Sequence, residues 1–387
     1  MELQKILSLI PANLLEELAV ETKVNIFTKK LQGEVIFKLL LHCIISHKDN
    51  SLRVMESAYE TLFFKLVNQG QKHTTIHYSS ISTRLSVINV SYFEKIFKTC
   101  VSLYHNELGE DKAHIMKFDS TIVALSTKLL QIGYHLKGGD AEKYRQLKFT
   151  VGYSNIPEIV HFYKEQTHSS ENITLKETIL KQSETEIKSI KVFDRGINAR
   201  KTYDIFTEKR IQFVSRINTN AKHDKKSSHP VKIVKTSTLE IVSDEWCQFY
   251  GETCKAKFLY RRIEATLLST GESICFITNI ENLTAEEITE IYKQRWEIEV
   301  FFRFIKQLLN LKHLISRNEN GIKVVLYVIM IAAILLQAYK KLNKLKGYKI
   351  TKLKFEADLE VEIVKDLVQI CGGNPDLINN ILACNSS

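Results

Sequence analysis

The sequence predicts an α/β protein with an all-helical N-terminal part, and three features of the chain support this fold class. Residues up to about 110 follow helical spacing, as in Leu14, Leu15 and Leu18, and contain little Gly or Pro. From residue 112 onwards, alternating β-rich segments and helical segments follow one another. Residues 218 to 282 contain several strand-like segments in succession, which predicts a separate β-rich unit.

The helical part includes residues 79 to 97, which resemble two helices meeting at a turn near Asn89. One hypothesis is a helix-turn-helix, whose first helix presents polar residues to a DNA groove. Those residues would be Ser79, Ser82, Thr83 and Arg84. An ordinary helical hairpin has the same pattern, so both interpretations stay open.

The α/β part contains two strand-like segments that each end in an aspartate. HIMKFD ends at Asp119 and SIKVFD ends at Asp194. If the two strands pair in one sheet, their carboxylates converge at its edge. Further segments predict the neighbouring elements: strands in KFTVGYS, IPEIVHFYK and IQFVSRI, and a helix in INARKTYDIFTEK.

A capping box at Thr284 and Glu287 predicts the start of a helix that continues through YKQRWEIEVFFRFIKQLLNL, residues 292 to 311. At about 100° per residue, four polar side chains share one face beside an apolar stripe. They are Tyr292, Arg295, Glu299 and Lys306. One interpretation is a set of surface ion pairs, worth about 0.2–0.5 kcal/mol each. The other is that Glu299 joins Asp119 and Asp194 in a carboxylate cluster that holds two Mg²⁺ ions.

The composition restricts the class of partner. Hydrophobic residues make up 44% and charged residues 25%, as in a globular protein, and the net charge of +10 favours polyanions such as nucleic acid. Seven cysteines without a C-x-x-C pair argue against a zinc module and predict reduced thiols. The apolar run from Val324 to Leu336 is shorter than the roughly 20 residues of a membrane span, which predicts a buried core helix.

The spacing Tyr292-x2-Arg295-x3-Glu299-x6-Lys306 resembles the Y-R-E-K signature of DDE transposases of bacterial insertion sequences, the IS-four family. Asp119 in FDST and Asp194 in FDRG resemble the two catalytic aspartates of that family. The stretches FVSRINTN and FITN are also similar to family members. The resemblance covers roughly residues 110 to 340 and implies a ribonuclease-H-like mixed-sheet core with a β-rich insertion.

By this resemblance, Asp119, Asp194 and Glu299 are the catalytic residues and bind two Mg²⁺ ions, for which Mn²⁺ would substitute. The residues implied to contact DNA are Tyr292, Arg295, Lys306 and Arg216. The implied partners are the inverted-repeat ends of the element, target DNA, and a second copy of the chain in the synaptic complex. The implied location is the bacterial cytoplasm, at the nucleoid when DNA is bound.

The expected organisation has five segments. They are a helical DNA-binding domain (1–110), the first part of the core (111–217), the β-rich insertion (218–282), the second part of the core (283–345) and a C-terminal tail (346–387). The expected activity is hydrolysis at each element end to free a 3′-OH, and joining of that hydroxyl to target DNA.

Three alternatives remain at this stage. A non-catalytic DNA-binding repressor would need no acidic triad, a plain nuclease would cleave without joining, and a membrane-associated protein would use the basic surface on lipid. Trp246 in the insertion could stack on a flipped base, although burial explains it as well. Lysines in the insertion could follow a DNA backbone or simply lie in a solvated loop. They are Lys222, Lys225, Lys226, Lys232 and Lys235.

Overall fold

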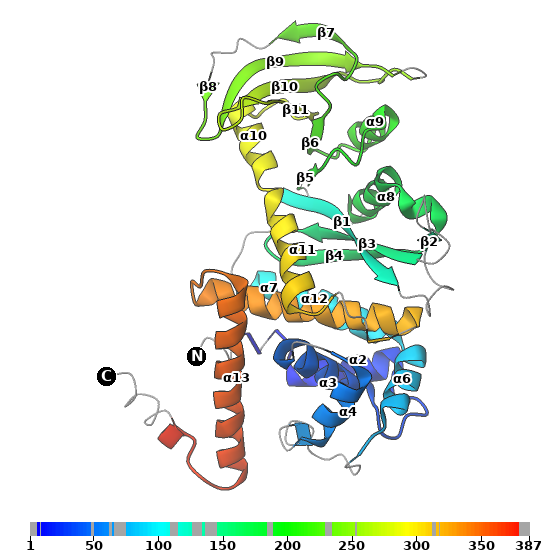
Figure 1. The fold of residues 1–387 in the computed structure, drawn as a ribbon, viewed down its shortest axis with the longest axis vertical. Coiled ribbons are helices and arrows are strands. Elements are labelled where there is room, and N and C mark those ends of the chain that lie inside the picture. Colours follow the sequence, from blue (N-terminus) through cyan, green and yellow to red (C-terminus); the bar gives the residue numbers. More distant parts are fainter. Residues whose placement is uncertain are drawn as a thin grey trace. The chain divides into compact units, whose positions relative to one another are not determined.

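The computed structural model forms two compact units (Figure 1). The helical unit comprises Met1–Glu110 and Phe304–Ser387, and the sheet unit comprises Asp111–Arg303. The structure describes residues 6–7, 9–47, 50–61, 64–65, 75–108, 115–125, 134–135, 145–183, 189–228, 234–251, 254–311, 315–316 and 318–378.

The helical unit is built around one long apolar helix, α12. Every residue of this helix from Val324 to Tyr339 is buried, and α12 packs against α3, α6 and α7. The predicted core helix is therefore confirmed. The helices of this unit are α2 (Ala12–Thr22), α3 (Gly33–Ser46), α4 (Leu52–Glu60), α6 (Tyr78–Val87), α7 (Val90–Glu107), α12 (Glu319–Leu342) and α13 (Tyr348–Ile370).

The predicted turn near Asn89 is confirmed, because the Asn89 side chain accepts a hydrogen bond from the Ser91 N–H (3.1 Å) and caps α7. Arg84 on α6 donates hydrogen bonds to the carbonyl oxygens of Leu31 (2.8 Å) and Val24 (2.5 Å). Its guanidinium therefore points into the unit, and the hypothesis that Arg84 faces a DNA groove is wrong.

The sheet unit contains one mixed sheet in the order β2-β3-β1-β5-β6-β11-β10-β9-β7, with β4 beside β3 and β8 beside β9 (Figure 1). The core strands are β1 (Ile115–Leu125), β2 (Tyr134–His135), β3 (Arg145–Tyr153), β4 (Pro157–Tyr163), β5 (Ile190–Phe193) and β6 (Phe213–Ile217). The remaining strands are β7 (His223–Ser228), β8 (Val234–Lys235), β9 (Leu239–Phe249), β10 (Tyr260–Leu267) and β11 (Ser273–Thr278).

The β-rich insertion does not form a separate sheet, contrary to the expectation from the sequence. Strand β11 pairs antiparallel with β6, from Thr278 opposite Val214 to Cys275 opposite Ile217. The edge of β6 would otherwise expose unpaired backbone groups, so the insertion extends the core sheet by satisfying them. Strands β1, β5 and β6 are parallel to one another, and β3 and β4 are antiparallel to their neighbours.

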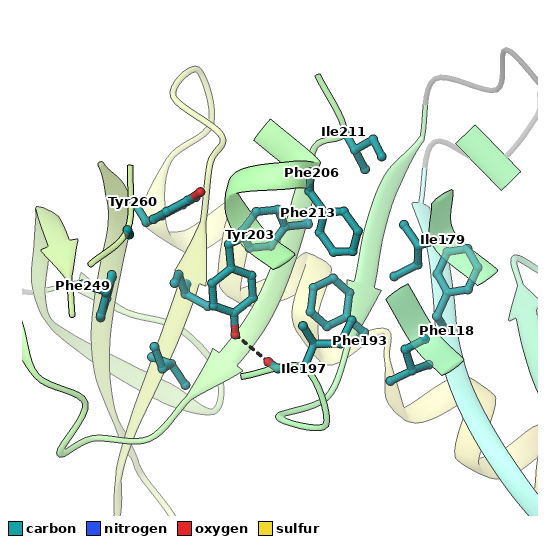
Figure 2. Close-up of a cluster of buried hydrophobic side chains, with 14 of the residues drawn as sticks. Phe118, Ile179, Phe193, Ile197, Tyr203, Phe206, Ile211, Phe213, Phe249 and Tyr260 are labelled. Carbon is teal, nitrogen blue, oxygen red and sulfur yellow. Dashed lines mark hydrogen bonds between the residues drawn. The ribbon is translucent and has the colours of Figure 1, made fainter. Parts of the chain in front are cut away.

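Helices cover both faces of the sheet near β1 and β5. Phe193 lies in an aromatic cluster with Tyr203 of α9 and Ile179 of α8 (Figure 2). Its neighbour Val192 packs instead in a cluster with Ile288 of α10. Successive residues of a strand point to opposite faces, so α8 and α9 cover one face and α10 covers the other. The helices are η3 (Gln166–Ser169), α8 (Glu171–Ser183), α9 (Arg200–Glu208), α10 (Ala285–Lys293) and α11 (Trp296–Leu308).

The predicted helix after Thr284 begins with the expected capping box, but it is two helices. The Thr284 hydroxyl accepts from the Glu287 N–H (3.2 Å), and the Glu287 carboxylate accepts from the Thr284 N–H (2.7 Å). The Arg295 N–H then bonds to the Tyr292 carbonyl, three residues back, at 2.9 Å. This tighter turn ends α10 and begins α11, so the angular argument for one continuous helix does not hold.

Candidate active site

The two aspartates directly follow an aligned pair of residues on parallel strands. Strands β1 and β5 are parallel, with Phe118 opposite Phe193, so Asp119 and Asp194 are the next residues on neighbouring strands. Both phenylalanines are fully buried, in a hydrophobic cluster that also contains residues of α8 and α9 (Figure 2). The buried aromatic pair therefore fixes the position of the two backbone segments from which the carboxylates extend.

Asp119 does not end its strand, contrary to the expectation. Strand β1 continues to Leu125, and Asp119 lies opposite Val151 of β3. The antiparallel pairing with β3 supports these extra residues, whereas β5 stops at Phe193, directly before Asp194. Each carboxylate accepts a hydrogen bond from the next backbone N–H: Ser120 to Asp119 at 2.7 Å, and Arg195 to Asp194 at 2.5 Å.

Glu299 lies in the first turn of α11 and pairs with Arg295. The Arg295 Nη2 donates to the Glu299 Oε1 at 2.5 Å, and the Glu299 side chain is about one-third exposed. Burial would lower the pKa of Arg295, but Tyr292, Glu299 and Asp194 raise it above its ordinary value. Arg295 thus supplies a cation between the helix-borne acid and the strand-borne acids.

The carboxyl group of Asp119 has a strongly perturbed pKa. Burial raises this pKa to about 6, and the negative charges of Glu171 and Asp194 act in the same direction. The Ser120 N–H and the Arg295 guanidinium act against the rise. A buried acid among other acids is typical of a functional site that is designed to receive positive charge.

Glu171 is a fourth acid of this neighbourhood that the sequence did not reveal. It is the first residue of α8, and a Cβ atom on residue 196 would overlap its carboxylate. The glycine of FDRG therefore leaves room for Glu171 beside the loop that follows Asp194. Glu171 and Asp119 also act on the buried Lys148, whose pKa burial lowers and these two acids partly restore.

A second feature that the sequence did not reveal is a contact between strand β1 and helix α11. The buried Lys117 ammonium donates to the Glu297 Oε2 at 2.9 Å and to the Ser154 carbonyl oxygen at 2.8 Å. Lys117 lies two residues before Asp119, and Glu297 lies two residues before Glu299. The bond therefore holds the two acid-bearing segments together. The residue types Lys-x-Asp and Glu-x-Glu were visible in the sequence, but their pairing was not.

Three of the four residues expected to contact DNA, Tyr292, Arg295 and Arg216, interact with one another. The Arg295 guanidinium lies 5.7 Å from the centre of the buried Tyr292 ring, and burial raises the pKa of Tyr292 to about 12. Arg216 on β6 acts electrostatically on the same tyrosine. The buried Nε atoms of Arg295 and Arg216 have no hydrogen-bond partner among the described residues. Lys306 lies further along α11, in the part that belongs to the helical unit, and its role stays a prediction.

The donor set suits a hard divalent cation. Asp119, Asp194, Glu299 and Glu171 offer only carboxylate oxygens, the ligands that Mg²⁺ prefers. Burial, with a smaller contribution from Glu171 and Asp194, raises the pKa of Asp119, and a bound cation would stabilise its charged form. Arg295 holds the Glu299 Oε1, so Arg295 and a metal ion would compete for this carboxylate.

Within the described residues, one group of three possible metal ligands has its ligand atoms within 4.8 Å of one another. Its members are His223, Glu245 and Cys247, and each offers one atom. Two features oppose metal binding there. Glu245 is paired with Lys225 at 2.5 Å, and burial raises the pKa of the Cys247 thiol to about 11. We assign this group no role.

The remaining candidates of the insertion have ordinary surroundings. Trp246 is half-buried on β9 opposite Arg261 of β10, and a role in base stacking stays a prediction. Lys225 and Lys235 pair with Glu245 and Glu240. Lys226 is exposed, and Lys232 lies outside the described residues.

In the mixed sheet, the antiparallel strands β4, β3 and β1 lie beside the parallel strands β5 and β6. This arrangement defines a ribonuclease-H-like core, with Asp119 on β1 and Asp194 directly after β5. The family model for the transposase DDE domain matches residues 114–335, which is more than half of the chain. The chain belongs to this family.

Three relatives agree with this membership. The chain is 26% identical over 296 residues to a putative transposase for insertion sequence element IS4SA of Synechocystis, covering 70% of this chain and 78% of that protein. It is 32% identical over 154 residues to a probable transposase for insertion sequence element IS5377 of Geobacillus stearothermophilus, covering 40% of each chain. A putative transposase y4zB of Sinorhizobium fredii is 26% identical over 155 residues, covering 40% of this chain and 43% of that protein.

Proposed function

We propose that this chain is a metal-dependent DNA transposase that cleaves the inverted-repeat ends of an insertion sequence and joins the freed 3′-OH to target DNA. One observation carries the proposal. Asp119 and Asp194 follow an aligned pair of residues on adjacent parallel strands, and Arg295 connects them electrostatically to Glu299. Membership of the transposase DDE domain family supports the same conclusion.

In this proposal, Asp119, Asp194 and Glu299 hold two Mg²⁺ ions, for which Mn²⁺ substitutes. Bound magnesium would supply the Lewis acidity that activates a water or a 3′-hydroxyl and stabilises the leaving oxygen. Glu171 adds negative charge beside Asp119 and strengthens the attraction for cations. The Lys117–Glu297 bond keeps α11 beside β1 so that the helix-borne and strand-borne acids act on the same phosphodiester.

DNA binding completes the proposal. Arg295 and Arg216 each have a buried Nε donor, and a phosphate oxygen is the partner that an arginine fork fits best. When a phosphate takes Arg295, Glu299 is released from its ion pair and becomes free to bind metal. We also propose that Lys306 contacts DNA, that two copies assemble on two element ends, and that the protein acts in the bacterial cytoplasm, at the nucleoid when DNA is bound.

The test is a supercoiled-plasmid nicking assay in Mg²⁺ with a plasmid carrying the element ends. We expect Asp119→Ala, Asp194→Ala and Glu299→Ala each to lose more than about 100-fold of the nicking rate, which exceeds the usual effect of changing a residue outside the metal ligands. Equal rates for wild type and the three variants would favour a non-catalytic DNA-binding repressor.

A second assay separates a transposase from a nuclease of the same fold. A pre-cut element end with a free 3′-OH is incubated with the protein, Mg²⁺ and a target plasmid. We expect covalent joining of the labelled end to the plasmid. Nicking without joining would favour the plain nuclease.

A further inference from the structure

A cavity of about 250 Å³ lies beside Asp194 in the sheet unit. Four cationic side chains line it: Arg195, Arg200, Arg216 and Lys222. No aspartate or glutamate is among the described residues of its wall, and the other polar groups are uncharged amides and tyrosines. A cavity with this lining has a strongly positive interior and selects an anion.

These four cations gather around one cavity, without a carboxylate partner among the described residues. Several other cations of the insertion have carboxylate partners, such as Arg261 with Asp244 at 2.5 Å and Lys257 with Glu208 at 2.9 Å. Within the described part of the chain, none of the four cavity cations forms an ion pair. The buried Nε atoms of Arg200 and Arg216 also have no hydrogen-bond partner there. Buried donors without partners are costly, so an external acceptor is expected.

The start of helix α9 adds to the positive field. Its N-cap residue, Ala199, has no side chain that can cap the helix, and both of its neighbours, Asn198 and Arg200, line the cavity. The first N–H groups of a helix and its dipole favour an anion at this end. Arg200 Nη1 donates to the Asn198 carbonyl at 2.5 Å, which keeps its guanidinium at the cavity wall.

The cavity adjoins the proposed catalytic acids. Arg195 directly follows Asp194 and donates its backbone N–H to that carboxylate at 2.5 Å. Arg216 lies on β6, the strand beside β5, and acts on Tyr292 next to Arg295. If the reacting phosphodiester of a DNA strand lies at the acids, a nearby phosphate of the same strand would therefore lie at the cavity.

We propose that this cavity is a second phosphate-binding subsite, which takes a backbone phosphate of the DNA strand beside the reacting phosphodiester. The inference rests on the proposed function and extends it to one defined cavity, in which Arg195 and Arg200 join Arg216 and Lys222. Arg200 and Lys222 bind the phosphate together with Arg216, and the positive end of the α9 dipole adds to their field. The subsite holds the strand in register with the carboxylates.

The test measures binding of the full-length protein to a fluorescein-labelled DNA duplex over a range of salt concentrations, without divalent cations. The double variant Arg200→Ala/Lys222→Ala should bind DNA more weakly, by about 10-fold or more. The negative slope of log K against log salt should become shallower by about 1 to 2. Lys209→Ala is the matched control, because Lys209 is an exposed cation at the opposite end of α9. Its binding and slope should equal those of wild type.

The result that overturns the inference is a double variant with the wild-type affinity and salt slope. Thermal melting checks that the variant is folded, and a variant that melts early is replaced by the single change Lys222→Gln, judged by the same two measurements. A separate arm titrates inorganic phosphate and follows the melting temperature. Stabilisation of wild type but not of the variant by free phosphate, with equal DNA binding, would assign the cavity to a free anion and also overturn the inference.

The two failures are distinguishable. If the wild-type protein nicks DNA in Mg²⁺ through its three acids while the double variant binds DNA normally, the subsite is wrong and the proposed function stands. If the wild-type protein neither nicks DNA nor binds it, the proposed function itself fails.

Discussion

The strand-borne acids and the helix-borne acid are held in different ways. Asp119 and Asp194 extend from backbone segments that the β1–β5 ladder and the buried pair Phe118 and Phe193 fix in place. Glu299 extends from α11, and the ion pair with Arg295 determines where its carboxylate lies. The first arrangement is set by many cooperative backbone contacts, whereas the second depends on one exchangeable side-chain partner.

This difference indicates a division of work within the candidate site. The sheet holds two carboxylates in fixed positions. Burial destabilises the charged form of Asp119, as its raised pKa indicates. The helix provides an acid that joins when Arg295 finds another anion. Metal binding and DNA binding would then be coupled through Arg295, because each ligand favours the arrangement that the other needs.

The largest effect on stability is expected from Asp119→Asn in metal-free protein. The pKa of Asp119 rises from 3.8 to about 6 on folding, so the folded state binds more protons between these values. The contribution of the Asp119 carboxyl group to the free energy of unfolding is most favourable below about pH 4 and is lost as the pH rises through 6. At pH 7 the Asn variant should be more stable by about 2–3 kcal/mol, since one pKa unit corresponds to ~1.4 kcal/mol.

Urea unfolding at pH 4 and pH 7 measures this effect. The gain should be present at pH 7 and absent at pH 4. A variant that is destabilised at pH 7 would show that Asp119 makes a stabilising contact instead. In the same pH range, Mg²⁺ affinity of the wild type should increase as the pH rises through about 6, because protons and Mg²⁺ compete for this carboxylate.

Lys117→Met tests the bond between the strand and the helix. The change leaves the Glu297 carboxylate and the Ser154 carbonyl without this donor, and we expect a loss of about 1–3 kcal/mol in the free energy of unfolding. The nicking rate should fall as well, because α11 carries Glu299. Lys293→Ala removes an exposed ion pair with Glu290 and should cost less than about 0.5 kcal/mol. Equal costs for the two variants would contradict a special role for Lys117.

Arg295→Gln tests the exchange of partners at Glu299. Without the guanidinium, Glu299 is free, so Mn²⁺ should bind the DNA-free protein several-fold more tightly, as measured by calorimetry. DNA binding should weaken, because the phosphate loses an arginine. A variant with weaker Mn²⁺ binding would mean that Arg295 positions the acids rather than competing for them.

The smallest effect is expected from Glu171→Gln. Removing this charge lowers the pKa of Asp119 below about 6, because Glu171 is one of the groups that raise it. The pH at which Mg²⁺ binding reaches half of its maximum should fall accordingly. Glu177→Gln, further along α8, is the matched control and should leave this midpoint unchanged. An unchanged midpoint in the Glu171→Gln variant would show that Glu171 does not act on the metal site.

Local patterns in the sequence were enough to predict many elements. The capping box at Thr284, the turn at Asn89 and the buried helix of Val324 to Leu336 are determined by residues close together in the chain, and the structure has all three. The aspartate after a β-rich segment was also recognisable at Asp194, because β5 stops one residue earlier. The roles of the acids and cations remain predictions.

The features that the sequence did not reveal depend on residues far apart in the chain. Strand β1 continues past Asp119 because β3 pairs with it, and the insertion joins the core sheet because β11 satisfies the edge of β6. The helix break at Arg295 is an exception, because it is a local turn that the apolar spacing of the segment does not show. The contact of Lys117 with Glu297 and the approach of Glu171 to Gly196 require the folded sheet.

The sequence by itself determined the kinds of residue at the candidate site, their order and the local elements that carry them, because spacing and capping act over a few residues. Only the tertiary structure decided which acids and cations are neighbours. Hydrogen-bonded strand register and the packing of helices on the sheet faces bring together charges separated by more than a hundred residues, and no local pattern encodes that pairing.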